Sequence, residues 1–96
     1  MDVEQFMRLH ALKAMTGAVA PTIIDLTPEA TADALALGAH GLPRTRDVRL
    51  RRVAGNDDGP VFDVTYIDRT QSITLRETVR NIDGQWKIAH IERAHR

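Results

Sequence analysis

Hydrophobic positions along the chain follow two different periods, and the change falls near Gly41. Over residues 3–16 they recur at steps of three and four, which predicts an amphipathic helix with Gly17 as its C-terminal stop. The stretch that follows contains Pro21 and is expected to form an irregular connector or a single helical turn.

A second helix has a clear predicted start. Thr27 is a favourable N-cap, Pro28 suits the first helical position, and Glu29 lies in the first turn. The helix is expected to end at Gly38 or Gly41.

After Thr45 the hydrophobic period becomes two, which predicts β-strands. Four strands are expected, over residues 47–53, 61–68, 71–82 and 86–92, and Asp83-Gly84 is a favourable two-residue hairpin turn between the last two. The predicted fold class is α+β: two N-terminal helices, then a curved four-stranded antiparallel meander that wraps the first helix. Residues 1–96 are expected to form one domain, since the length leaves no room for a second.

Two segments resemble parts of a known superfamily. The run LRETVRNIDGQWKI at residues 75–88 resembles the end of nuclear transport factor 2-like (cystatin-like) domains, where a long strand turns at Asp-Gly and a Trp-Lys-Ile strand returns. The run DLTPEA at residues 25–30 resembles the start of the second helix in small bacterial members. The resemblance implies a minimal cystatin-like domain, in a superfamily that holds isomerases, dehydratases, epoxide hydrolases, ligand-binding modules and interaction domains.

Composition excludes several classes of protein. The chain has no cysteine, so disulfide frameworks and thiolate metal sites are ruled out. The four histidines show no metal-ligand spacing, no phosphate loop is present, and neither a metal nor a cofactor is expected. The N-terminus starts polar and acidic, and no apolar run is long enough to cross a bilayer, so we expect a cytoplasmic protein without membrane contact.

Glu77 is the main candidate for chemistry. It shares one face of its predicted strand with Ile73, Leu75 and Val79, so it interrupts an apolar face. A carboxyl group in apolar surroundings has a raised pKa and can act as a general acid or base near neutral pH. Two alternatives are that the apolar face reaches solvent at this point, or that Glu77 pairs with an arginine.

Two further candidates, His90 and Asp63, could assist Glu77. His90 alternates with Trp86 and Ile88, so we expect it on their face of the last strand, where it could carry protons. Asp63 could face Glu77 or His90 from a neighbouring strand, which would complete an acid–base cluster.

Aromatic side chains suggest where a ligand could bind. Tyr66 and Trp86 are the candidate ligand-binding residues, for a small apolar ligand. Tyr66 is expected on the opposite face from Asp63, because the two are three residues apart in one strand.

Arginines gather before and within the first predicted strand, where five lie within nine residues: Arg44, Arg46, Arg49, Arg51 and Arg52. Arg49 and Arg51 share one strand face, and they could bind phosphates or an acidic partner. The alternative is a solvated sheet face on which these arginines pair with nearby aspartates.

Self-association is expected from a set of hydrophobic residues assigned to the outer side of the sheet: Val53, Val61, Ile67, Ala89 and Ile91. One pair of helices cannot cover them all, and pairing of two sheets in a homodimer would bury them.

Three function classes follow from these features. The first is a ligand-binding or protein-interaction module that self-associates through its sheet. The second is a small acid–base enzyme of the isomerase or dehydratase type that uses Glu77 with His90 or Asp63. The third is a winged-helix DNA-binding domain, with residues 28–40 as recognition helix and residues 61–80 as wing. Nucleic acid is an unfavourable partner, since residues 27–40 contain no Lys, Arg, Asn or Gln.

Overall fold

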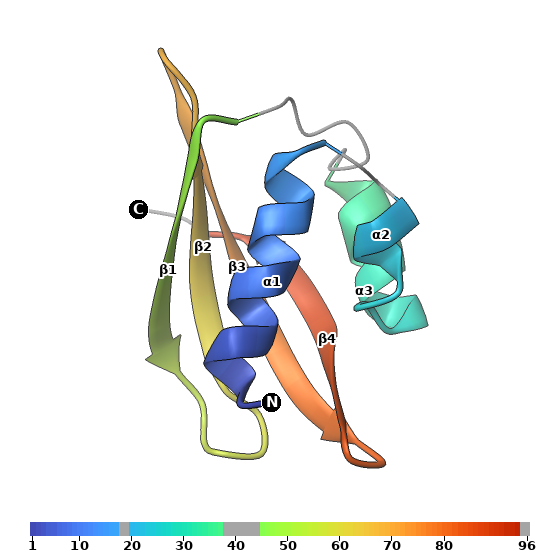
Figure 1. The fold of residues 1–96 in the computed structure, drawn as a ribbon. Helices are drawn as coiled ribbons and strands as arrows, with labels where there is room; N and C mark the ends of the chain where they lie inside the picture. Colours follow the sequence, from blue (N-terminus) through green and yellow to red (C-terminus); the bar gives the residue numbers. More distant parts are fainter. Residues whose placement is uncertain (18–19, 38–44, 95–96) are drawn as a thin grey trace.

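The structure, a computed structural model, describes residues 1–17, 20–37 and 45–94, and within them it contains three helices and four strands (Figure 1). The helices are α1 (Val3–Met15), α2 (Ala20–Ile23) and α3 (Pro28–Ala36). The strands are β1 (Asp47–Ala54), β2 (Val61–Ile67), β3 (Ser72–Ile82) and β4 (Gln85–Arg93). The predicted α+β class is confirmed, and the expected connector forms the one-turn helix α2. The expected end of the second helix, at Gly38 or Gly41, lies outside the described residues.

Both longer helices begin at capping side chains that the sequence provides. The carboxylate of Asp2 accepts a hydrogen bond from the Gln5 amide at 2.8 Å at the start of α1. The Thr27 hydroxyl accepts one from the Ala30 amide at 3.2 Å at the start of α3, with Pro28 at the first helical position as predicted. After α1, Gly17 has a φ of 78°, a left-handed conformation that favours glycine.

The strands form one antiparallel sheet in the order β1-β2-β3-β4, so the predicted meander is confirmed. Asp83 and Gly84 have φ values of 53° and 83°, as a tight two-residue hairpin requires. The Asn81 side chain accepts a hydrogen bond from the Gly84 amide at 3.0 Å and helps to hold this turn. Residues 61–80, the wing of the winged-helix alternative, lie in β2 and β3, which are the two central strands of this sheet.

The core lies between the helices and one face of the sheet, called here the inner face (Figure 1). α1 contributes Met7 and Ala11, and α3 contributes Ala30. The sheet contributes Phe62, Val64, Tyr66, Leu75, Val79, Ile88 and Ile91. The opposite, outer face is not covered by any of the described helices.

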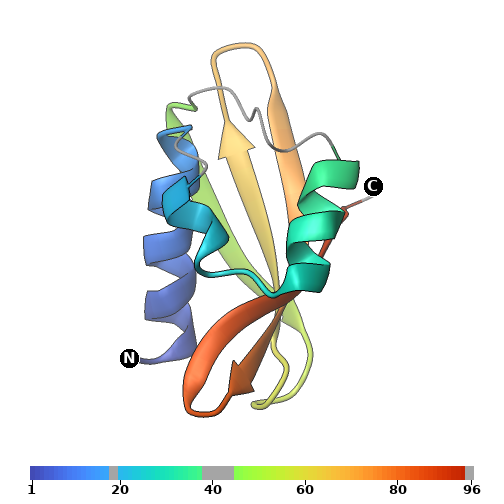
Figure 2. The same cartoon turned by 90° about the vertical axis from the view of Figure 1, so that its right-hand side faces the viewer.

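One edge of the sheet is covered by the link between α2 and α3. The Ile88 amide donates to the Asp25 carbonyl at 2.8 Å, and the Thr27 amide donates to the Ile88 carbonyl at 2.9 Å. These bonds form a short parallel bridge between Leu26 and Ile88. Figure 2 shows the link crossing β4 between α1 and α3. β1 lies at the other edge and, in the described chain, pairs only with β2.

An irregularity in β4 changes which side chains face inward. Thr78 is opposite His90 but Val79 is opposite Ile88, so Ala89 is an extra residue on β4. Ile88 and Ile91 are therefore both buried, whereas His90 is exposed. The prediction that His90 shares the face of Ile88 is wrong for this reason.

None of the helices in residues 1–17, 20–37 and 45–94 is long and apolar enough to span a membrane.

Candidate functional site

Glu77 lies on the inner face, as predicted, and is only 1% exposed. The nearest residues on the same face of β3 are Leu75 and Val79, and Phe62 is directly opposite on β2. One carboxylate oxygen, Oε2, is buried without a hydrogen-bond partner. Burial raises the pKa of Glu77, and the nearby His10 counteracts this only in part.

His10 on α1 is the buried group that approaches Glu77 most directly. Its Nε2 atom lies 3.6 Å from Oε1 of Glu77, longer than a hydrogen bond but within the range of an ion pair. Its Nδ1 atom lies 2.9 Å from Oδ2 of Asp25, at hydrogen-bond distance. Lys13, one helical turn further along α1, places Nζ 2.6 Å from the same Asp25 oxygen. We call Glu77, His10, Asp25 and Lys13 the inner cluster.

The two carboxyl groups of the inner cluster, those of Asp25 and Glu77, differ in the direction in which their pKa values are shifted. Burial raises the pKa of Asp25, but hydrogen bonds from His10 and Lys13 outweigh it and leave the pKa below its ordinary value. Asp25 is therefore a stable anion that orients the imidazole, while Glu77 at the buried end holds its proton more strongly than an exposed carboxyl group. The two carboxyl groups of the cluster are thus shifted in opposite directions, the pKa of Glu77 upward and the pKa of Asp25 downward.

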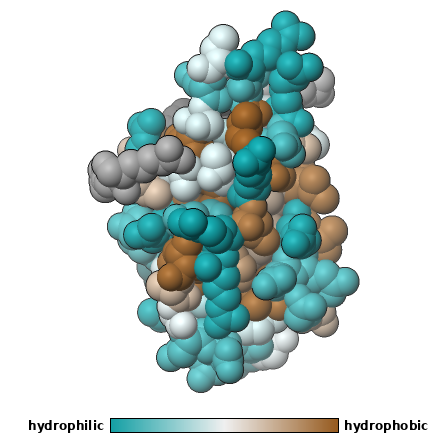
Figure 3. All heavy atoms as spheres, turned by 90° about the vertical axis from the view of Figure 1, so that its left-hand side faces the viewer, coloured by the Kyte–Doolittle hydropathy of each residue, from teal (hydrophilic) through white to brown (hydrophobic). Residues whose placement is uncertain are grey.

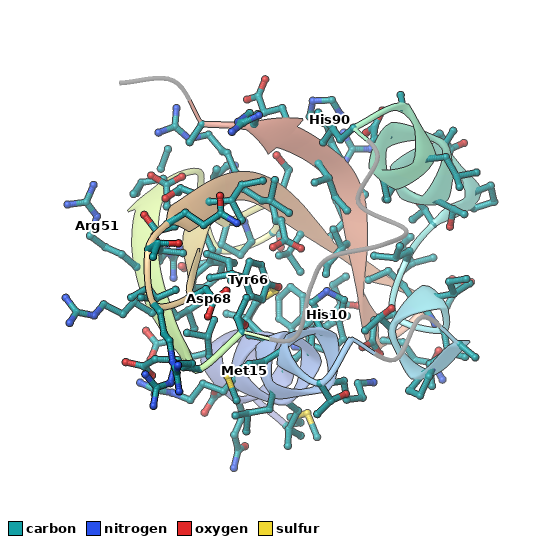
Figure 4. All side chains as sticks on the ribbon, turned by 90° about the horizontal axis from the view of Figure 1, so that it is seen from above. His10, Met15, Arg51, Tyr66, Asp68 and His90 are labelled. Atoms are coloured by element: carbon teal, nitrogen blue, oxygen red, sulfur yellow. The ribbon has the colours of Figure 1, made fainter. Side chains whose placement is uncertain are left out.

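Tyr66 connects this cluster to a small hollow at the end of the sheet. Burial raises the pKa of the Tyr66 phenol well above its ordinary value, and the charge of Glu77 adds to the shift, so the hydroxyl stays protonated. In Figure 4, Tyr66 and His10 both lie in the space between the sheet and α1. The hollow has a volume of about 160 Å³ and is lined by Thr45, Tyr66, Asp68, Gln71, Ser72, Ile73 and Arg93.

Asp63 and His90, the two predicted assistants of Glu77, lie elsewhere. Asp63 is on the outer face, where both of its oxygens accept hydrogen bonds from the Arg76 guanidinium at 2.9 and 3.2 Å. His90 places Nδ1 2.6 Å from Oδ2 of Asp33 on α3, an oxygen that also accepts the Ile91 amide at 3.0 Å. The prediction that either residue faces Glu77 is wrong, because Asp63 has the opposite strand parity and the extra residue in β4 turns His90 outward.

The two candidate ligand-binding aromatics lie at opposite ends of the sheet. Tyr66 is opposite Ile73, and Trp86 is opposite Asn81, which lies eight residues further along β3. Eight residues of strand span about 26 Å. Trp86 instead donates a hydrogen bond from Nε1 to the Met1 carbonyl at 3.3 Å. The two side chains therefore cannot contact one small ligand together.

The outer face of the sheet carries many polar and charged side chains. Two cross-strand rows run over it, Arg51–Asp63–Arg76–Glu92 and Arg49–Thr65–Thr74. Arg49 and Arg51 share this face as expected, and Arg44 lies outside the described residues. Ile91 was expected here but is 6% exposed in the core, because the extra residue in β4 turns it inward.

Sequence reasoning missed three members of the inner cluster, His10, Asp25 and Lys13. The signal for His10 was its place on the apolar stripe of the first helix, three residues after Met7 and four before Ala14. Asp25 lies in the apolar stretch that ends at Leu26. A polar residue inside an apolar pattern is the same signal that identified Glu77.

Neither family models nor curated proteins nor solved structures show a match to this chain. Among residues 1–17, 20–37 and 45–94, no group of three or more His, Asp or Glu side chains could hold a metal ion.

Proposed function

We propose that the chain binds a small, uncharged, mostly apolar molecule with a carbonyl group at the inner face, and that Glu77 transfers a proton to and from a carbon next to that carbonyl. The observation that carries this proposal is the buried Glu77 oxygen without a hydrogen-bond partner. Unpaired buried carboxyl oxygens are destabilising, and proteins tend to retain such groups where a ligand uses them.

The reaction uses groups that the inner face already holds. The Glu77 carboxylate would take a proton from the carbon, and the electron pair of the broken C–H bond would move toward the carbonyl oxygen. The Tyr66 hydroxyl, kept protonated by its raised pKa, would donate a hydrogen bond to that oxygen. The Glu77 carboxyl group would then return its proton to the same or a neighbouring carbon, as in an isomerisation.

His10 and Asp25 act as positioning residues in this proposal. Asp25 holds the imidazole through Nδ1, so that Nε2 faces Oε1 of Glu77. The resulting interaction lowers the pKa of Glu77 from the value that burial alone would set. A base with an adjusted pKa can both accept and return a proton near neutral pH.

The experiment is exchange of carbon-bound protons for deuterium in D₂O, with cyclopentanone as the probe and ¹H NMR as the readout. The wild-type protein should accelerate the exchange, and Glu77→Gln should abolish the acceleration. Asp63→Asn is the matched control, since it alters a carboxylate of the adjacent strand on the outer face, and it should leave exchange unchanged. No acceleration by wild type, or equal losses in both variants, would contradict an acid–base role of Glu77.

We also propose that the chain is a small member of the nuclear transport factor 2-like superfamily. Support comes from the helix α1 packed on the inner face of a four-stranded antiparallel meander, together with the sequence resemblance at residues 75–88.

Self-association is a second candidate function, because several large hydrophobic side chains of the helical side are exposed: Leu9, Leu12, Ile23, Ile24, Leu35 and Leu37. A homodimer would cover part of this surface. Sedimentation equilibrium over a concentration series tests this, and a monomer at high micromolar concentration would contradict it.

A further inference from the structure

The strand β1 forms an edge of the sheet with different chemistry on its two sides. Its only strand partner in the described chain is β2, so its other backbone edge faces no strand, and of the β1 amides that of Val48 donates to the Asp47 carboxylate at 2.8 Å. Arg49 and Arg51 point to the outer face, whereas Val48 and Leu50 lie on the inner face and pack against the core. Figure 4 shows Arg51 directed away from the molecule.

On the outer side, β1 borders a polar hollow of about 550 Å³. Its lining combines the unpaired cations of Arg49 and Arg51, the ion pair of Asp63 with Arg76, and the hydroxyls of Thr65 and Thr74. Arg76 and Arg52 have carboxylate partners, but no ion pair or hydrogen bond of the described residues involves the side chains of Arg49 and Arg51. Among the described residues, neither of these two neighbouring cations has an anionic partner within ion-pair distance.

On the inner side, β1 borders an apolar groove of about 210 Å³ between the strand and α1. The groove is lined by Arg8, Ala11, Leu12, Met15, Asp47, Val48 and Leu50. Leu12 is 49% exposed, although a leucine against a core strand is usually covered. Figure 3 views the molecule from this edge, where hydrophilic residues extend down the middle and hydrophobic residues are visible among them and on both sides.

We infer that the β1 edge binds an extended segment of a partner protein in which acidic and hydrophobic residues alternate, and that this segment joins the sheet as a fifth strand. Successive side chains of a strand point to opposite faces, so the acidic residues would meet Arg49 and Arg51 while the hydrophobic ones would enter the groove beside Leu12. Backbone hydrogen bonds would provide affinity, and the two faces would select the sequence.

A second copy of the chain fits this edge poorly. Two β1 strands side by side would bring together Arg49, Arg51 and Arg52 from both copies, and like charges on adjacent strands are destabilising. The same repulsion does not arise with an acidic strand. Charge therefore favours a partner of different composition.

Fluorescence anisotropy with two labelled eight-residue peptides tests the inference. In one peptide glutamate and valine alternate, and in the other the four glutamates precede the four valines. The alternating peptide should bind full-length protein about tenfold more tightly, because only it presents charge and apolar surface on opposite faces. Its affinity should fall with added salt.

Two pairs of variants locate the binding site. Arg49→Glu with Arg51→Glu should weaken binding of the alternating peptide about tenfold, whereas Arg69→Glu with Arg80→Glu, which alters two other exposed arginines, should leave it nearly unchanged. Leu12→Lys should weaken binding, whereas Leu9→Lys should not: both leucines are on α1 and 49% exposed, but only Leu12 lines the groove.

Three results would overturn the inference: equal affinity for the two peptides, equal losses in the site and control variants, or a dimer whose formation protects the β1 amides from hydrogen exchange. Glu77→Gln should bind the alternating peptide as the wild type does, which separates this surface from the inner cluster.

Discussion

The two faces of the β2–β3 pair each hold a buried carboxylate, and the two groups are treated in opposite ways. Asp63 on the outer face is paired with Arg76 through two hydrogen bonds. Glu77 on the inner face is one register position away along the sheet, but it has an imidazole at 3.6 Å and one oxygen without any partner. The residue that is less exposed is thus the one that is less well paired.

This difference indicates which carboxylate is retained for stability and which for another role. A hydrogen-bonded ion pair such as that of Asp63 offsets the loss of hydration of its charges. For Glu77 only the His10 imidazole at 3.6 Å offsets part of the cost of burial, so its charged form opposes folding. Groups that reduce stability without local compensation are typical of functional sites.

The largest expected effect is a difference in unfolding free energy between substitutions on the inner and the outer face of the sheet. Phe62→Ala removes a ring that is 1% exposed on the inner face, opposite Glu77, and should cost about 3–5 kcal/mol of unfolding free energy. Thr65→Ala, on the outer face of the same strand, loses one hydroxyl contact with Thr74 and should cost about 1 kcal/mol. Urea denaturation measures both. Similar losses would contradict the assignment of the core to the inner face.

The next effect is the pH dependence of stability that Glu77 imposes. Its pKa is raised in the folded protein above the ordinary value of 4.5, so the folded state holds the proton more strongly than the unfolded state. The stabilisation from this proton is complete below about pH 4.5 and is lost as pH rises through the folded pKa. The Glu77→Gln side chain does not titrate. At pH 8 the unfolding free energy of this variant should therefore exceed that of the wild type by about 1–3 kcal/mol.

Thermal denaturation at pH 4 and pH 8 measures this difference. For a domain of this size, each kcal/mol corresponds to roughly 4–8 °C in Tm. Asp25 acts in the opposite direction, since its lowered pKa removes stability only as pH falls below 3.8. A Glu77→Gln variant that is less stable than wild type at pH 8 would show that the carboxylate is compensated in the folded state.

Local patterns predicted the elements of this fold and the face of Glu77. Alternation within one strand is enough to show that Glu77 shares a face with Leu75 and Val79, because the backbone alone fixes that relationship. The Thr27 cap of α3 and the Asp83-Gly84 turn were predicted in the same way, since a few neighbouring residues determine them.

The residues that contact Glu77 could not be predicted from local patterns, because their positions depend on tertiary packing and strand register. His10 is 67 residues away in the chain, and its contact with Glu77 arises only when α1 packs on the inner face. The placement of His90 depended on one extra residue in β4, which reverses the alternation from that point. Without strand register, Asp63 could not be assigned to Arg76 rather than to Glu77.

The smallest expected effect concerns the ion pair of Asp63 with Arg76 on the outer face. Asp63→Asn keeps the shape of the side chain but removes its charge, so one of the two oxygens that accept from Arg76 is replaced by an NH2 group and the remaining hydrogen bond has a neutral acceptor. Because the Arg76 side chain is 41% exposed, water can replace part of this interaction, and the loss should be about 1 kcal/mol. Chemical denaturation at pH 7 in low and high salt provides the measurement, and high salt should reduce the difference between variant and wild type. Glu77→Gln should stabilise the protein at pH 8. If Asp63→Asn also stabilised it, the charge of the outer carboxylate would be as poorly compensated as that of the inner one. The two carboxylates would then differ in exposure but not in the quality of their pairing.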